Sequence, residues 1–164
     1  MNRASAAVDL RNRGAAPSEP HEFVSITVAG QHFGIPVLQV QDVLGPQRIT
    51  PIPLAPPEVA GSLNLRGRIV TAIDLRTRLK LPKLPDGEAG MSVVVDHNGE
   101  LYSILVDAVG EVLSLGAGAQ QRNPPTLDPA WRDVSGGIYR LDATLMVILN
   151  VARVLDFGVR TDIA

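Results

Sequence analysis

Residues 61–79 read GSLNLRGRIVTAIDLRTRL, and this stretch predicts a β-hairpin followed by a short helix. Apolar residues alternate with others on both sides of Arg66-Gly67, so two strands are expected to meet in a turn at that dipeptide. Asp74 can accept hydrogen bonds from free backbone N–H groups, and it predicts the start of a helix over LRTRLK. The tip of a hairpin needs glycine for its positive φ angle, but it does not need arginine. The arginine therefore requires a separate explanation.

The chain contains a second copy of this pattern. The same stretch aligns without gaps to GIYRLDATLMVILNVARVL at 137–155, and GQHFGIPVLQVQDVL at 30–44 aligns to GELYSILVDAVGEVL at 99–113. We therefore expect one strand-rich unit to occur twice, in repeats at approximately 22–82 and 91–157, with exchange of strands between the units left open. Each repeat has the size of a small closed barrel, in which no sheet edge is exposed. Chance similarity between alternating strands is the alternative explanation.

Arg66 has no arginine counterpart in the second repeat, where the alignment places Asp142. The repeated unit therefore folds without this arginine, which makes Arg66 a candidate functional residue. The alternative is that Arg66 is a solvated turn residue, because residues at loop tips are usually polar and exposed.

Short strands separated by turns are expected along most of the remaining chain. EFVSITVA at 22–29 alternates, and Asn98-Gly99 between the apolar runs at 91–96 and 100–107 is a strong hairpin signal. Asn150 predicts a second short helix over VARVLD. The expected fold class is all-β, with a few short capping helices.

The composition indicates a globular protein without a membrane span. Hydrophobic residues make up 45% of the 164 residues and the mean hydropathy is +0.14, which is ample for a core. The longest apolar run in the body of the chain, LMVIL at 145–149, is far shorter than the roughly 20 residues that a bilayer requires. Residues 1–21 lack the pattern of a signal peptide and are expected to be disordered, and residues 158–164 are expected to form a flexible tail.

Charge, aromatic content and cysteine content limit the expected partners. A net charge of −2 and an aromatic content of 4% argue against binding of duplex DNA or of single strands. The absence of cysteine excludes disulfides and thiolate metal ligands, and it fits a reducing cytoplasm. We therefore expect no nucleic-acid partner and no direct insertion into a membrane.

No sequence pattern for catalysis or for a cofactor is present. GAGAQQ at 116–121 begins like a phosphate-binding loop, but its third glycine is replaced and no strand–helix unit follows, so a plain flexible loop is expected. His21, His32 and His97 are isolated and lack the spacing of metal ligands. There is no Gly-x-Ser-x-Gly elbow and no cysteine nucleophile. The expectation is a protein that is not an enzyme and that uses neither a cofactor nor a metal.

Two further segments allow alternative interpretations. ITPIPLAPPE at 49–58 fits a polyproline ligand, but a stiff connector between the first two strand pairs is the favoured interpretation. Basic residues at 66, 68, 76, 78 and 80 fit either contact with an anionic surface or the solvated side of a short helix.

Four blocks of the chain together resemble the CheW family of bacterial chemotaxis coupling proteins and CheW-like domains. The blocks are EFVSITVAGQHFGIPVLQVQDVL, GSLNLRGRIVTAIDLRTRL, SILVDAVGEVLSL and LMVILNVARVLDF, and the likeness covers about residues 22–157. Its most specific elements are Asn64-Leu65-Arg66-Gly67, followed by a strand and Asp74-Leu75-Arg76, and the D-x-V-x-x-V-L block at 107–113. No receiver, kinase or phosphotransfer segment accompanies these blocks, which favours a free-standing adaptor over the regulatory domain of a kinase.

The resemblance implies two five-stranded, SH3-like β-barrels with a groove between them. It implies a non-catalytic scaffold in the cytoplasm, associated with membrane-bound receptor arrays. The implied partners are the cytoplasmic helical hairpin of a chemoreceptor (methyl-accepting chemotaxis protein) and the regulatory domain of the histidine kinase CheA. The receptor-binding positions that carry over are Val40, Asp42, Gly61, Asn64, Arg66, Val109 and Val112. Where the family commonly has glutamate, this chain has the shorter Asp42.

The chemistry of these residues fits such a partner. A helical hairpin docks through apolar anchors on one face. Arginine is enriched at interface hot spots because its planar guanidinium can donate two hydrogen bonds at once to a carboxylate or to carbonyl oxygens. Val40 and Val112 are expected to line the groove, with Arg66 at its rim. The alternative function is a small-barrel interaction module that serves an enzyme or a nucleic acid.

Overall fold

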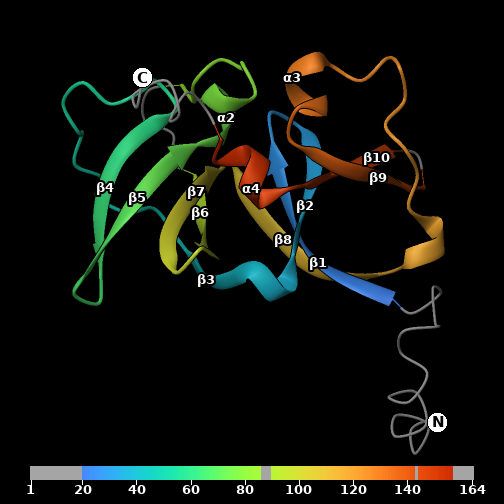
Figure 1. Ribbon diagram of the computed structural model, residues 1–164, viewed down its shortest axis with the longest axis horizontal. Coiled ribbons are helices and arrows are strands. Elements are labelled where there is room, and N and C mark those ends of the chain that lie inside the picture. Colours follow the sequence, from blue (N-terminus) through green and yellow to red (C-terminus); the bar gives the residue numbers. More distant parts are fainter. Residues whose placement is uncertain (1–19, 86–89, 143, 157–164) are drawn as a thin grey trace, which may run out of the picture.

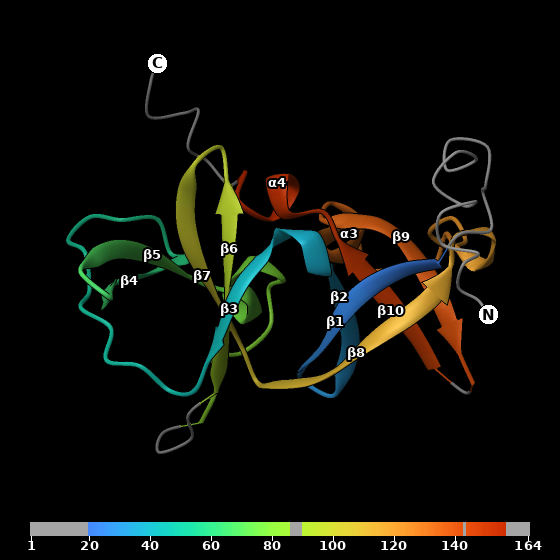
Figure 2. The ribbon, with the colours of Figure 1, turned by 90° about the horizontal axis from the view of Figure 1, so that it is seen from below.

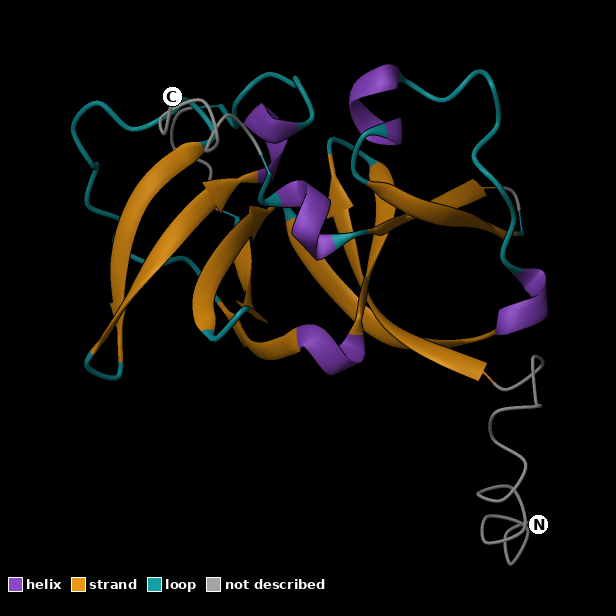
Figure 3. Cartoon of the chain, viewed as in Figure 1, coloured by secondary structure: helices purple, strands orange, loops and turns teal. Residues whose placement is uncertain are grey.

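The computed structural model describes residues 20–85, 90–142 and 144–156, and their strands form two five-stranded sheets (Figures 1 and 3). The first sheet has the order β8-β1-β2-β10-β9 and the second the order β3-β6-β7-β5-β4. The strands of the first sheet are β1 (Pro20–Val28), β2 (Gln31–Pro36), β8 (Ala108–Gly116), β9 (Ser135–Leu141) and β10 (Thr144–Leu149). Those of the second are β3 (Val40–Leu44), β4 (Val59–Leu65), β5 (Arg68–Asp74), β6 (Met91–His97) and β7 (Glu100–Val106). The all-β class is confirmed.

Short helices connect or follow these strands. The α-helices are α2 (Leu75–Arg78), α3 (Pro129–Arg132) and α4 (Val151–Val154), and the 3₁₀ helices are η2 (Val37–Gln39) and η3 (Ala117–Ala119). As predicted, Asp74 caps α2 by accepting from the backbone N–H of Arg76, and Asn150 caps α4 by accepting from that of Arg153. None of the helices in the described ranges has the length and apolar character that a bilayer crossing requires.

The segments expected to be disordered or flexible, 1–21 and 158–164, lie outside the described residues apart from Pro20 and His21. These two residues begin β1. The GAGAQQ segment differs from the plain loop that we expected. Its first glycine ends β8, η3 follows, and Gln121 pairs with Ile138 of β9.

The two sheets are related by the sequence repeat, but each sheet is built from both copies. If β1 to β5 are matched in order with β6 to β10, the strand order of one sheet becomes that of the other. Each sheet therefore takes the first hairpin of one repeat and the last three strands of the other. The chain crosses between sheets at η2 and again at Asp107, the residue between β7 and β8. Parallel pairs join the two repeats within each sheet, β2 with β10 and β5 with β7.

Each sheet closes into a barrel at an equivalent place. In the second sheet, Thr50 pairs with Ser62 of the edge strand β4 through two backbone hydrogen bonds of 2.8 Å. In the first sheet, Gln121 pairs with Ile138 of the edge strand β9 through backbone bonds of 2.8 and 3.0 Å. We call these the first barrel (β8-β1-β2-β10-β9) and the second barrel (β3-β6-β7-β5-β4).

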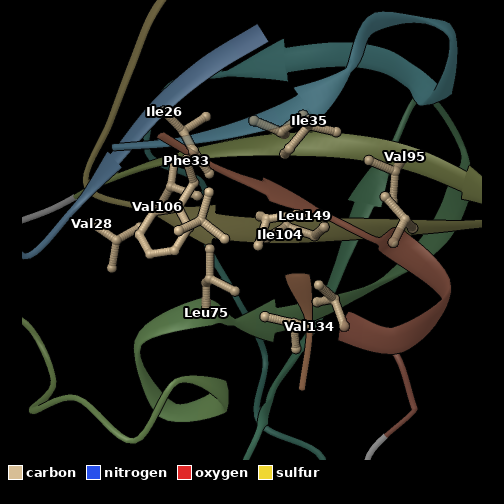
Figure 4. Close-up of a cluster of buried hydrophobic side chains, with 14 of the residues drawn as sticks. Ile26, Val28, Phe33, Ile35, Leu75, Val95, Ile104, Val106, Val134 and Leu149 are labelled. Atoms are coloured by element: carbon tan, nitrogen blue, oxygen red, sulfur yellow. The ribbon is translucent and has the colours of Figure 1, made fainter. Parts of the chain in front are cut away.

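The largest hydrophobic cluster joins the two barrels. Figure 4 shows Ile26 and Phe33 of the first barrel in the same cluster as Val95 and Ile104 of the second. Two smaller clusters each draw on one barrel, around Tyr139 in the first and around Leu63, Val70 and Ala72 in the second. Because the largest core belongs to both barrels, they form one folded unit.

Candidate functional site

The tip of the β4–β5 hairpin holds Arg66 in an unusual backbone conformation. Arg66 and Gly67 both have positive φ angles, 52° and 87°, as a tight turn between twisted strands requires. The side-chain oxygen of Asn64 accepts a hydrogen bond of 3.0 Å from the Gly67 N–H and so supports the turn. The Arg66 side chain is 74% exposed. The hairpin therefore presents the guanidinium to solvent.

Arg66 forms an ion pair with Asp42 that links the two edge strands of the second sheet. Its Nη2 donates to Oδ2 of Asp42 at 2.8 Å, so the shorter carboxylate does reach the arginine. Asp42 lies on β3 and Arg66 follows β4, and these strands are the two edges of that sheet. The hydrogen bonds from Arg66 and from the Val43 N–H lower the pKa of the Asp42 carboxyl. An ion pair this exposed is screened by water and contributes little stability.

The valines of the predicted site lie on β3 and β8, at the boundary of the core that the barrels share. Val40 on β3 and Val109 on β8 are half-buried and pack against that core. Val112 is 52% exposed and pairs with Val24 of β1. Figure 2 shows β3 in the middle of the molecule, and β8 beginning nearby and then running along the first barrel beside β1.

A β-bulge explains how two valines spaced by three share one face. Between Val109 and Val112 the register against β1 shifts, so their partners Ile26 and Val24 are only two positions apart. The same shift occurs on β3 between Val40 and Val43. Val43 was not predicted as a site residue, yet it is 38% exposed. The repeat alignment places it opposite Val112, and that correspondence was the available signal.

Gly61 is buried on β4 and is required by the closure of the barrel. Its φ angle is 149°, and a Cβ atom there would collide with the backbone carbonyl of Thr50. Gly137 occupies the equivalent place in the first barrel, with a φ angle of 128° and with Gln120 against it. The need for glycine at 61 therefore follows from the fold of both repeats.

Comparison with known proteins places the chain in a family. A family model described as a CheW-like domain matches residues 22–158. The chain belongs to the CheW-like domain family. It is 28% identical over 135 residues to the chemotaxis protein CheW of Klebsiella aerogenes, which covers 82% of this chain and 81% of that protein. It is 25% identical over 147 residues to CheW of Rhizobium meliloti, with 90% and 91% covered.

A solved CheW structure has the same fold. The crystal structure of the scaffolding protein TtCheW from Thermoanaerobacter tengcongensis superposes with a TM-score of 0.75 at 27% sequence identity. The match covers 85% of this chain and 94% of that one.

The basic residues of this CheW-like domain do not form one solvated face. Arg68 and Lys80 are exposed, as Arg66 is. In contrast, Arg78 is buried and donates to the backbone oxygens of Val154 at 3.0 Å and of Arg153 at 2.8 Å. Arg76 is also largely buried, in an ion pair with Asp107. Two of the five cations thus join structural elements, so neither interpretation of the basic residues, contact with an anionic surface or a solvated helix side, applies to all five.

The described part of the domain lacks the side-chain cluster of a metal site. It contains no group of three or more histidine, cysteine, aspartate or glutamate side chains that could hold a metal ion. The proline-rich segment 49–58 connects β3 to β4, and Leu54 within it is fully exposed. The site is therefore a surface that presents an arginine, a carboxylate and valines.

Proposed function

We propose that this protein is a non-catalytic adaptor in chemotaxis that couples chemoreceptors to the histidine kinase CheA. The observation that carries the proposal is the Arg66–Asp42 ion pair, held at an exposed hairpin tip of a CheW-like domain. Arginine is locally unfavourable at this tip, so its presence is better explained by a partner than by folding.

The proposed receptor site combines the ion pair with the valines on β3 and β8. A receptor tip is a helical hairpin, and its apolar anchors would lie on Val40, Val43, Val109 and Val112, which flank the shared core. Arg66 would bond a carboxylate or a carbonyl of the receptor, with Asp42 holding the guanidinium in place. Asn64 and Gly61 contribute indirectly, by shaping the turn and the strand that carry Arg66.

The proposed kinase contact is with the regulatory domain of CheA, in the cytoplasm beneath an array of receptors. Each contact can be weak, because two partners must share the surface of two small barrels. Joining both partners to one rigid unit raises the local concentration of kinase at the receptor to about the millimolar range. The proposed mechanism is thus that the protein holds receptor and kinase together in one complex.

The proposal is tested by titrating the protein into a mixture of CheA and soluble receptor fragments at low micromolar concentration. Kinase autophosphorylation should respond to the receptor only when the protein is present. The response should then fall at large excess, because binary complexes replace ternary ones. A rise to a plateau without decline, or chemical turnover by the purified protein alone, would contradict a bridging role.

A further inference from the structure

Asp107 stands where the chain passes from the second barrel to the first. It is the only residue between β7 and β8, and its backbone N–H donates to the carbonyl oxygen of Thr27 at 3.1 Å. Its Oδ2 accepts a hydrogen bond of 2.8 Å from the N–H of Ala29, in the turn between β1 and β2. Asp107 therefore ties the crossover to the first barrel at two points.

Arg76 ties the same residue to the second barrel. Arg76 lies on α2, directly after β5, and it bonds both carboxylate oxygens of Asp107, from Nε at 2.9 Å and from Nη2 at 2.6 Å. Its Nη1 donates to the carbonyl oxygen of Pro82 at 2.8 Å. The side chains are 14% and 21% exposed, so water screens this pair much less than it screens Arg66 and Asp42. Two parallel bonds fix direction as well as distance.

The other crossover has no such ion pair. The repeat alignment places Leu38 of η2 at the position of Asp107, and Ala152 of α4 at the position of Arg76. Leu38 is 93% exposed. The chain thus passes between barrels once with the ion pair and once without it. The two-barrel architecture therefore does not itself require the Arg76–Asp107 ion pair. The ion pair is better explained by a role beyond folding.

We propose that Arg76 and Asp107 are positioning residues for the receptor site. Val109 follows Asp107 by two residues and Val112 by five, so the point and direction of the crossover set where both valines lie. Arg66 and Asp42 belong to the second barrel, whereas Val109 and Val112 belong to the first. The ion pair holds Val109 and Val112 of the first barrel in register with the part of the site on the second barrel, which comprises Arg66, Asp42 and the valines of β3. This inference rests on the proposed receptor-binding function.

The first arm of the test measures barrel orientation in the protein alone. The chain has no cysteine, so spin labels can be attached at Arg68→Cys on β5 and Arg140→Cys on β9, two exposed sites on different barrels. Asp107→Asn and Arg76→Gln should each shift or broaden the distance distribution between the labels. Arg76→Lys, which keeps the charge but loses the planar fork, should have a smaller effect.

A matched control separates orientation from stability. Val70→Ala weakens a cluster confined to the second barrel and leaves the crossover intact. It should lower the melting temperature while the label distances stay as in the wild type. If Val70→Ala broadens the distances as much as Asp107→Asn does, the ion pair acts only through stability and the proposal is wrong.

The second arm measures affinity for a soluble receptor-tip fragment below the melting temperature of every variant. Asp107→Asn and Arg76→Gln should each weaken binding about tenfold, and the double variant should lose no more than either one, because both remove one interaction. Unchanged affinity, or a loss of affinity without a change in label distances, would overturn the proposal. If the wild type does not bind the fragment, the proposed function fails, while the label distances still decide whether the pair sets barrel orientation.

Discussion

Arg66 occupies a backbone conformation that asparagine or glycine adopts more readily. For a residue with a side chain such as arginine, a left-handed conformation costs about 1–2 kcal/mol. The equivalent turn of the second repeat has Asp142 at a φ angle of 39°, and aspartate tolerates this region well. Because the exposed ion pair with Asp42 offsets little of this cost, the residue is retained against local preference. Such exceptions are characteristic of binding surfaces.

Replacing Arg66 should separate binding from stability. We expect Arg66→Asn to leave the free energy of unfolding unchanged or to raise it by up to about 1 kcal/mol, because the strain at the turn is relieved. Affinity for a receptor-tip fragment should fall by about 30-fold or more, as for an interface hot spot. Arg68→Asn, two residues away, serves as the control and should bind normally. A melting temperature that collapses in parallel with binding would show that Arg66 is structural.

Asp107 gives the protein a defined sensitivity to acid. The hydrogen bonds from Arg76 hold the pKa of the Asp107 carboxyl below its ordinary value, although partial burial opposes them, and the Ala29 N–H lowers it further. Because the unfolded chain binds this proton more readily, the stabilisation is complete above about pH 5 and is lost as the pH falls through the lowered pKa, below about pH 4.

Asp107→Asn should therefore lower the free energy of unfolding by about 1–3 kcal/mol at neutral pH. The difference from the wild type should shrink as the pH falls through the lowered pKa and acid protonates Asp107 in the wild type. Urea unfolding of both proteins across the pH range measures this directly. A difference that does not change with pH would mean that shape, and not charge, accounts for the role of Asp107.

At the scale of the elements, local signals were enough to predict strands, turns and caps. The turn at Asn98-Gly99 and the caps at Asp74 and Asn150 lie where short-range chemistry placed them. Helix α3 was missed, although Asp128 followed by Pro129 is a helix-start signal that could have been used. The parallel pairs of β2 with β10 and of β5 with β7 join distant segments, and no local pattern encodes them.

The same distinction applies to the site. The repeat alignment isolated Arg66, because it compares what each copy needs in order to fold. The alignment could also have identified Val43 as a site residue, because it places Val43 at the position of Val112. The contact of Arg76 with Asp107 depends on where the chain crosses between barrels, and that crossing is visible only in the assembled structure.

Closure of the second barrel depends on Gly61, and a pair of substitutions isolates this role. Gly61→Ala should destabilise the protein by about 2–4 kcal/mol, since the new methyl group meets the Thr50 carbonyl in a backbone conformation that is already unfavourable for alanine. Gly30→Ala has a positive φ angle of 79° but open space around it, so it should cost only about 1 kcal/mol. Chemical denaturation compares the two. Equal losses would mean that the conformation, and not the collision, matters at Gly61.

At the scale of the whole molecule, the repeat produces near-symmetry, and the site breaks it. The valines at 40 and 43 correspond to those at 109 and 112, so the apolar surface belongs equally to both copies. The polar residues differ, because the counterparts of Asp42 and Arg66 are Glu111 and Asp142. The crossovers differ as well, with Asp107 in one and the exposed Leu38 in the other. With one shared apolar surface and one set of polar contacts, the proposed receptor site would accept one receptor in one orientation.

This asymmetry can be tested by moving the arginine. Asp142→Arg places an arginine on the equivalent hairpin tip of the first barrel, yet it adds no second apolar surface. Calorimetric titration with a receptor-tip fragment should therefore still give one site per protein, with an affinity within about twofold of the wild type. The double variant Arg66→Asn with Asp142→Arg should remain as weak as Arg66→Asn alone, because the crossover at Leu38, which leads into β3, has no counterpart of the ion pair that sets β8. Two sites per protein, or full recovery of binding in the double variant, would show that the proposed receptor site is functionally symmetric and that the orientation of the receptor is not set by Arg66.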